Sequence, residues 1–451
     1  MKSRKLSRRD FLRLASATAG GAVMVACAAP VPTEQAPQVA APKAATKVTV
    51  QFWGEQWTKE TFAELVKEFN AQSPDVSVEP MNVPSTQEKL ITAVSGGTPP
   101  DLFFMDRYIA AEWAARGLIA PLDDYIAKST VKPENLYPKL RQDVTWQGKI
   151  VALPLWTDCR AFYYNKKLLS GAGLDPEKPP KTWEELETMA DKITKKDAAG
   201  RLDMVGFTPT WGNPTTFMQW WVYLWQLGGE YLSEDQSKAI FNSDAGVKAL
   251  EWCLQWVDKL GGIEQVDAFA QQAVPVTGAD IFTMGRLGMM INGNWIIPPY
   301  KRVAPDLEYG VATFPLPPNG QWANYIGGWT FTIPKGAKNP AASFKFIEFM
   351  LSREVQLRVV EYYGGIPAFQ PVAMSEDYYK QAPLNKFWAE EVLHGRWVPV
   401  TPGVSEMFAV MGRMWDGALH KADTPKDALD KAVSEVQTIL DKNRPQREGK
   451  S

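Results

Sequence analysis

The chain has 451 residues, is 45% hydrophobic and 22% charged, and carries a formal net charge of −2. This length and composition are typical of a folded protein whose core divides into two domains or lobes. The small net charge and the lack of a Lys/Arg cluster argue against nucleic acid as a partner and against electrostatic adhesion to anionic lipid. The 18 tryptophans are unusual. Because such a large ring with an N–H group is costly to bury completely, we expect many of them to line a surface or a cavity.

The first 26 residues have the pattern of an export signal. Arg8 and Arg9 precede an apolar run over 14–26 that is shorter than the ~20 residues a bilayer needs. The paired arginines resemble a twin-arginine signal, and the small residues before Cys27 resemble the lipobox of bacterial lipoproteins. We therefore expect residues 1–26 to be a signal peptide and Cys27 to carry a lipid; the alternative is an ordinary N-terminal helix with an ordinary cysteine. Without these 26 residues, which hold six basic residues and one acid, the formal charge is −7.

Residues 27–46 have the composition of a tether. Four prolines stand among alanine, valine, threonine and glutamine in this segment. Such a sequence stays extended or disordered, and ~19 residues at ~3 Å each reach some ~60 Å. We expect the folded body to be attached to the outer face of the cell membrane, at the cell surface or in the periplasm, through this lipid anchor only.

From residue 47 to residue 106 the sequence alternates between strand and helix patterns. The expected elements, in chain order, are a strand at 48–52, a helix through 62–69, a strand at 76–78, a helix opened by a capping box at 85–88, and a strand at 101–106. This order predicts a parallel sheet with helices on its faces. Ligands of such sheets bind beyond the carboxyl ends of the strands, here near 53–57 and 106–108.

A second α/β lobe is expected from residue 152 onward. An apolar run at 152–156 continues through 162–165, and a capping box at 182–185 opens an amphipathic helix. The other expected elements are helices near 215–227 and 244–259, strands at 289–292 and 309–313, and helices that begin at Asn339-Pro340 and Thr424-Pro425.

The sequence offers little equipment for catalysis. It contains no phosphate-binding glycine loop, no dinucleotide fingerprint, no nucleophile elbow and no Cys-x-x-Cys. We expect its two histidines, His394 and His420, to lie on the surface. Whether Cys159 and Cys253 pair stays open, although buried thiols are the expected outcome. We predict no catalytic residue, no cofactor and no metal, and paired carboxylates are the one remaining route to an enzyme.

Short clusters that combine an aromatic ring with small polar residues stand at predicted strand ends and in loops. A sugar presents an apolar C–H face and a rim of hydroxyls, so its receptor needs aromatic platforms beside side chains that grip oxygen atoms. The candidate ligand-binding residues are Trp53, Glu55, Trp57, Asp106, Arg107, Asp158, Trp211, Asn213, Asn294, Trp295, Gly328, Trp329, Arg396 and Trp397. The alternative is core packing, which we favour for the tryptophans on predicted helices: Trp183, Trp220, Trp221, Trp225, Trp252 and Trp256.

Six segments in the right order resemble the bacterial extracellular solute-binding proteins of family 1, the sugar-capturing lipoproteins of ABC importers, which have the architecture of maltose-binding proteins. They are 48–53, 96–103, 153–169, 180–186, 285–295 and 327–335. The resemblance implies a two-lobe periplasmic-binding-protein fold (type II-like), with a mostly parallel sheet flanked by helices in each lobe. It also implies an N-terminal lobe of 47–155 plus 328–366, a C-terminal lobe of 156–327 plus 367–445, and hinge crossovers near 154–158, 325–329 and 365–371. The twin-arginine signal is a departure, since many relatives carry general-secretion signals.

The resemblance and the residues together predict a monomer that captures a carbohydrate, a disaccharide or short oligosaccharide, between its lobes and delivers it to a membrane permease. Two rival functions stay open. One is a lipid-anchored glycosidase that acts on the same sugars. The other keeps the fold and binds a non-sugar solute, such as a glycerol phosphodiester or a polyamine.

Overall fold

The computed structural model describes residues 47–55, 58–83, 86–209, 217–273, 280–397 and 400–444, and the chain from Thr46 onward forms one compact unit. The predicted signal peptide, the tether and Cys27 lie outside these residues, as do Trp57, Trp211 and Asn213.

The first three strands form the parallel part of an 11-stranded sheet. Strand β1 (Val48–Gly54) pairs in parallel with β2 (Val76–Asn82) on one side and with β3 (Leu102–Asp106) on the other. Helices α2 (Thr58–Gln72) and α3 (Thr86–Ser95) connect these strands. The apolar face of α2, which includes Phe62, is buried against the sheet beside Phe52 of β1. The predicted alternation of strand and helix is confirmed here.

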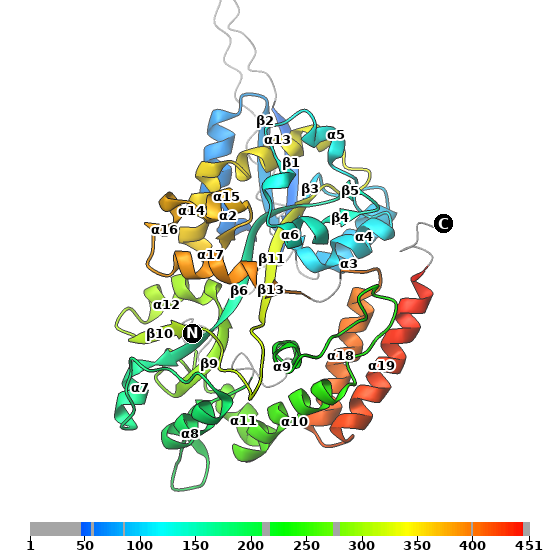
Figure 1. Ribbon diagram of the computed structural model, residues 1–451. Helices are drawn as coiled ribbons and strands as arrows, with labels where there is room; N and C mark the ends of the chain where they lie inside the picture. The colour runs from blue at the N-terminus through cyan, green and yellow to red at the C-terminus, as the bar shows by residue number, and fades with distance from the viewer. Residues whose placement is uncertain are drawn as a thin grey trace, which may run out of the picture. The chain divides into compact units, whose positions relative to one another are not determined.

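Two long strands run through the middle of the molecule (Figure 1). All 13 residues of β6 (Leu153–Asn165) are buried. Residues 153–159 pair antiparallel with β11 (Asn324–Thr332), whereas residues from Arg160 onward pair with β9 (Leu287–Gly293) and β10 (Tyr309–Ala312). The strand therefore passes from one group of strands to another between Cys159 and Arg160. The apolar run expected to start at 152 and continue through 165 forms one strand, buried on both faces.

The far end of the sheet contains β8 (Leu202–Phe207), which is parallel to β9, and β7 (Lys195–Lys196), which is antiparallel to β8. The predicted α/β class is confirmed. The expectation of mostly parallel sheets holds in part: β1 is parallel to β2 and β3, and β8 is parallel to β9, whereas each described pairing of β6 is antiparallel. Strand β6 pairs with both groups of strands and runs antiparallel to them. Such pairs do not need the helical crossover connection that parallel strands need.

Three chain segments lie side by side at the first half of β6. Thr157 pairs with Gly328 of β11 and with Ile366 of the short strand β12 (Ile366–Pro367). These are the places where the resemblance puts the three hinge crossovers. The lobe boundaries themselves stay a prediction.

The tryptophan-rich helices contribute their rings to the hydrophobic core. Trp220, Trp221 and Trp225 of α9 (Trp220–Gln226) are buried, as are Trp252 and Trp256 of α10 (Asp244–Lys259). The ring of Trp183 at the start of α8 (Trp183–Ile193) stacks on Trp252 with 4.1 Å between centroids. Core packing is therefore confirmed for these six rings.

The remaining elements cover the sheet and close its ends. The other helices are α4 (Ala110–Ala115), α5 (Asp123–Ile126), α6 (Pro138–Asp143), α7 (Lys166–Gly171), α11 (Ile263–Ala270), α12 (Ile297–Val303), α13 (Pro340–Met350), α14 (Arg353–Tyr363), α15 (Gln370–Ala373), α16 (Glu376–Tyr379), α17 (Asn385–Leu393), α18 (Val404–Leu419) and α19 (Pro425–Lys442). Short pieces are η1 (Arg107–Ile109), η2 (Pro133–Asn135), η4 (Asn294–Ile296), β4 (Thr145–Trp146), β5 (Lys149–Ile150) and β13 (Gly395–Arg396). The predicted cap of α19 is confirmed, since Thr424 Oγ1 accepts the N–H of Asp427 at 3.2 Å.

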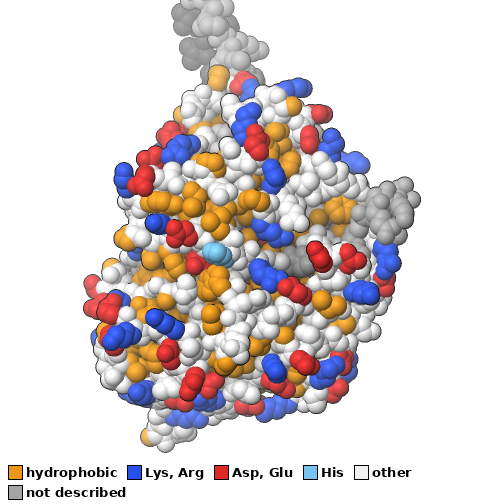
Figure 2. Space-filling model, viewed as in Figure 1, with side chains coloured by type: hydrophobic (Ala, Val, Ile, Leu, Met, Phe, Trp, Pro, Cys, Tyr) orange, Lys and Arg blue, Asp and Glu red, His pale blue; other side chains and the backbone are white. Residues whose placement is uncertain are grey.

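The surface and the thiols agree with a globular body. Within the ranges given above, Cys159 and Cys253 are buried and unpaired, and no helix is long and apolar enough to cross a bilayer. His394 and His420 are exposed, as expected. Figure 2 shows acidic and basic side chains intermixed over the face that it draws, with hydrophobic side chains between them.

Candidate ligand-binding site

A cavity of about 660 Å³ opens where β6 passes from β11 to β9. This size lies within the range of small-molecule sites, roughly 300–1,000 Å³. We call it the ligand cavity. It is lined by Asp106, Trp156, Asp158, Arg160, Met218, Asn294, Trp295, Pro299, Arg302, Tyr325, Gly327, Gly328, Trp329, Tyr363, Gly365 and Trp397.

Half of the residues predicted from the sequence meet in this cavity. Seven of the fourteen candidates line it: Asp106, Asp158, Asn294, Trp295, Gly328, Trp329 and Trp397. They come from the end of β3, from β6, from the turn after β9, from β11 and from the segment after β13. Residues almost 300 positions apart in the sequence are thus brought to one place by the crossing of β6 and β11.

Four described candidates do not line the cavity. Trp53 and Glu55 lie at the end of β1. Arg396 pairs with Glu230, and its guanidinium lies 5.0 Å from the ring centroid of Trp225.

Arg107 is the fourth candidate outside the cavity lining. Its side chain is buried, its Nε donates to Asp143 Oδ2 at 3.1 Å, and its Nη1 donates to the carbonyl of Gly327 at 2.6 Å. Arg107 therefore holds β11 in place from outside the cavity lining.

Asp106 ends β3 and is the cavity's least compensated acid. Its carboxylate Oδ1 accepts the backbone N–H of Tyr108 in a long hydrogen bond of 3.5 Å. Burial and, second, the charge of Asp158 raise the pKa of Asp106 to about 7, although Arg107 and Arg160 oppose the shift. A hydroxyl donor from a ligand would stabilise the charged form of this group.

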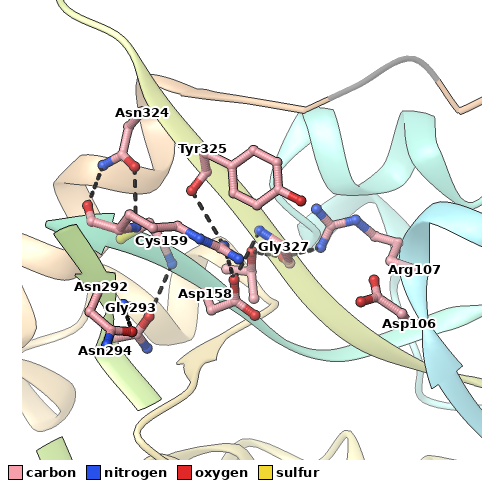
Figure 3. A network of polar contacts seen from close by, with 12 residues as sticks. Asp106, Arg107, Asp158, Cys159, Asn292, Gly293, Asn294, Asn324, Tyr325 and Gly327 are labelled. Carbon is pink, nitrogen blue, oxygen red and sulfur yellow. Dashed lines mark hydrogen bonds and ion pairs between the residues drawn. The ribbon is translucent and has the colours of Figure 1, made fainter. Parts of the chain in front are cut away.

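Asp158 is tied to the backbone of β11 (Figure 3). Its Oδ1 accepts the N–H of Gly327 at 3.0 Å and also bonds Arg160 Nη1. Both bonds fall on the same oxygen, and Oδ2 accepts no hydrogen bond from a described residue. The carboxylate is thus fixed in orientation with one oxygen available to the cavity.

Gly328 allows the two strands to approach closely. Its φ is +135°, and a Cβ atom there would lie 2.5 Å from the carbonyl oxygen of Trp156 and 2.8 Å from Arg107 Nη1. The predicted role of this glycine, close backbone approach, fits its geometry. Any side chain would push β11 away from β6 at the cavity wall.

Aromatic rings make up most of the remaining wall. Trp329 stacks on Phe104 at 5.7 Å and 21°, and Trp156 stacks on Tyr363 with the same values. Trp397 packs against Tyr325 with 4.4 Å between ring centroids. Each platform is therefore supported from behind by a second ring.

Asn294 uses its side chain within the protein. Its Oδ1 accepts the N–H of Cys159 at 3.0 Å, and its Nδ2 donates to the carbonyl of Gly364. We predicted from the sequence that this amide orients hydroxyls, but the contacts found fix the turn after β9 against β6.

A second cavity of about 790 Å³ shares Asn294 with the first. Its aromatic lining consists of Tyr164, Tyr309, Tyr378 and Trp388. Among the residues that the structure describes, no carboxylate lines it. It therefore offers apolar surface without the strong acceptors that the ligand cavity has.

Several lining residues were missed in the sequence, notably Arg160, Tyr325 and Tyr363. The signal for Arg160 was present, because residues two apart on a strand share a face and Asp158 lies two residues before it. Tyr325 and Tyr363 carried no such signal, since they come from β11 and from the end of α14, far along the chain.

Comparisons with known proteins agree on the kind of molecule. A family model described as bacterial extracellular solute-binding protein matches residues 64–386, more than half of the chain. The chain is 26% identical over 398 residues to a maltotriose-binding protein of Pyrococcus abyssi, covering 85% of this chain and 78% of that protein.

Solved structures show the same fold. An ABC transporter solute-binding protein of Thermotoga lettingae, bound with α-D-tagatose, is similar with a TM-score of 0.76 and 28% identity, covering 88% of this chain and 100% of that one. Maltose-bound MalE3 of T. maritima is similar with a TM-score of 0.72 and 26% identity, covering 87% and 99%. These likenesses confirm the predicted two-lobe periplasmic-binding-protein fold.

Proposed function

Since the chain belongs to the bacterial extracellular solute-binding proteins, we propose that it is the substrate-binding component of an ABC importer and captures a disaccharide or short oligosaccharide in the ligand cavity. The observation that carries the proposal is the meeting of aromatic platforms with two carboxylates in one cavity. Trp295, Trp329 and Trp397 offer ring surface, and Asp106 and Asp158 offer acceptor oxygens.

This combination suits a sugar better than the rival solutes. A pyranose covers an aromatic ring with its C–H face and donates hydroxyl protons from its rim. A phosphodiester needs several cationic side chains, but the arginines in the described lining are Arg302 and Arg160, and Arg160 is paired with Asp158. A polyamine needs several uncompensated acids, and Asp158 is already neutralised by Arg160.

The relatives support a carbohydrate of modest size. Their names and bound ligands are maltotriose, maltose and α-D-tagatose. A ligand that contacts both groups of strands joined by β6, for example Trp329 of β11 and Trp295 after β9, favours the closed arrangement of the two groups, which the permease would recognise.

The proposal includes the attachment of the protein. Residues 1–26 direct export by the twin-arginine route, Cys27 carries the lipid, and residues 28–46 hold a monomeric body near the outer face of the membrane. The binding reaction needs no cofactor and includes no turnover of the sugar, although the acid pair in the cavity makes hydrolysis the activity to check.

Thermal denaturation of the purified protein with a panel of ligands tests the proposal. The panel contains maltose, maltotriose, cellobiose and xylobiose, with spermidine and glycerophosphocholine as non-sugar solutes. We expect at least one sugar to raise Tm and to bind in a calorimetric titration, because a ligand of the folded state stabilises it by mass action. A shift with spermidine or glycerophosphocholine alone would assign a non-sugar solute, and release of monosaccharides on long incubation would assign a glycosidase.

A further inference from the structure

Arg160 is a buried cation in the wall of a cavity that suits a neutral ligand. Its guanidinium carbon lies 4.7 Å from the ring centroid of Trp295 and 4.1 Å from that of Tyr325, so two aromatic rings hold it. Its Nη1 bonds Asp158 Oδ1 and donates to the carbonyl of Tyr325 at 3.5 Å. The side chain is therefore fixed by two rings, a carboxylate and a backbone carbonyl.

The backbone of Arg160 is fixed as well. Asn324 of β11 accepts its N–H at 3.1 Å and donates to its carbonyl at 2.8 Å, and the same Asn324 amide group donates to Glu391 of α17 at 2.8 Å. Figure 3 shows Asn324 and Tyr325 of β11 beside Asp158 and Cys159 of β6. Arg160 thus stands at the point where β6 changes partners, with both its main chain and its side chain held.

The neighbours of Arg160 are two of the groups that we assign to the ligand. Trp295 has one face beside the guanidinium, and its ring packs so closely over Gly293 that a Cβ there would lie 1.8 Å from it. These contacts define which part of the ring remains available. On the other side, the bond to Asp158 Oδ1 leaves Oδ2 to accept a hydroxyl proton.

We propose that Arg160 is a positioning residue of the ligand cavity: it holds the Trp295 ring and the Asp158 carboxylate as one rigid unit, and by neutralising Asp158 it makes the cavity select neutral over cationic ligands. The proposal rests on the proposed function, sugar binding in this cavity. A guanidinium suits the task because it is flat enough to lie between two rings while its edge bonds a carboxylate, which a lysine ammonium cannot do.

Replacement of Arg160 separates this role from a merely structural one. In Arg160→Met, which keeps an unbranched apolar side chain but removes the guanidinium, we expect the affinity for the tightest-binding of maltose, cellobiose and xylobiose to fall about tenfold. The affinity for spermidine itself should rise about tenfold, because Asp158 is left uncompensated. Arg160→Lys keeps the charge, so it should retain the discrimination against spermidine while it loses part of the sugar affinity. Should Arg160→Met fail to fold, Arg160→Lys carries the test alone.

A double-mutant cycle tests whether Arg160 acts through Trp295. If it does, Arg160→Met should cost less than about twofold in a Trp295→Ala background, because the ring that it positions is gone. The matched control is Arg286→Met, since Arg286 also lies over a ring, Phe269 at 5.2 Å, and pairs with Asp203, but does not line the cavity. It should bind like the wild type.

Three outcomes distinguish the positioning role of Arg160 from the proposed function. Unchanged affinity and selectivity in Arg160→Met, or costs that add fully with those of Trp295→Ala, would overturn the positioning role while sugar binding stands. A wild-type protein that binds none of the sugars would overturn the proposed function, and this role with it. A loss confined to Arg160→Met, with coupling to Trp295 and a shift toward spermidine, supports the role.

Discussion

The two cavities on either side of Asn294 are similar in size and both are rich in aromatic rings, but they differ in chemistry. The ligand cavity has Asp106 and Asp158 in its wall, and its rings are backed by further rings. The second cavity, lined by Tyr164, Tyr309, Tyr378 and Trp388, has no carboxylate. Aromatic surface alone is common in a chain with 18 tryptophans, so the acceptor oxygens are what distinguish a sugar site.

The wall of the ligand cavity depends on a close approach of β6 and β11 at Gly328 that tolerates no side chain. Gly328→Ala places a Cβ against Trp156 and forces a residue other than glycine to a φ of +135°. We expect a loss of about 1–3 kcal/mol in the free energy of unfolding, together with the loss of sugar binding, measured by thermal denaturation and calorimetry.

The matched control is Gly412→Ala in helix α18. No heavy atom outside its own helix lies within 4 Å of a Cβ built there, so alanine should leave binding unchanged and stabilise the protein by up to ~1 kcal/mol. If Gly328→Ala and Gly412→Ala had the same effect on stability and on sugar binding, the close approach of β6 and β11 would not determine the shape of the cavity.

A substitution at one aromatic residue of each cavity tests directly which cavity binds the sugar. Trp329→Ala removes a platform of the ligand cavity, and we expect the affinity for sugar to fall more than tenfold, or ~1.4 kcal/mol. Tyr309→Phe changes only the hydroxyl of a ring in the second cavity and should bind normally. A titration in which Tyr309→Phe is the more damaging change would move the site to the second cavity.

The sequence predicted the acids of the site better than its cations, for a physical reason. Asp106 stands at the end of an apolar strand, and Asp158 lies among aromatic residues. Because a buried charge is costly in such surroundings, an acid there indicates a function. Arg107 follows Asp106 directly and lies outside the cavity lining, bonded to Asp143 and Gly327. The two-residue period of strands, which also places Asp158 and Arg160 on one face, was the unused signal.

Other parts of the site could not be predicted from local patterns. Tyr325 meets Trp397 and Arg160 only because β11 lies between β6 and the segment after β13. Such contacts depend on which strands become neighbours, and strand order is set by the whole sheet. The helices and the first strands were predictable, in contrast, because each is specified by its own caps and spacing, as the cap of α8 shows: Thr182 Oγ1 accepts the N–H of Glu185.

Protonation offers a smaller perturbation that acts on the ligand cavity through Asp106. Its pKa of about 7 in the folded protein, against an unperturbed 3.8, means that the folded state binds the proton more tightly than the unfolded state. This group therefore costs no stability below about pH 4, costs increasingly more as the pH rises to about 7, and costs a constant amount above that. Asp106→Asn should remove this cost, so its Tm relative to the wild type should increase between about pH 4 and pH 7.

Ligand binding should report the same proton. If a sugar hydroxyl donates to the Asp106 carboxylate, binding favours its charged form and releases a fraction of a proton near pH 7. Calorimetry in buffers of different ionisation enthalpy measures this release, which Asp106→Asn should abolish. The pKa of Glu391, also raised by burial to about 7, serves as a check, because Asn324 and not a ligand bonds it and Asp106→Asn leaves it in place. A pH-independent difference between the variant and the wild type would contradict the assignment.

The smallest expected effect on either cavity comes from the predicted lipid attachment. Cys27→Ser should release the protein from the membrane fraction, because a serine cannot carry the lipid, while its sugar affinity stays within twofold of the wild type. Fractionation of cells followed by titration of the released protein measures both.

The same substitution tests the role of the tether. If the anchored body delivers sugar to a permease in the same membrane, cells with Cys27→Ser should take up less of the sugar although the protein binds it equally well. Unchanged membrane association would show that another part of the chain, or a retained signal segment, holds the protein there.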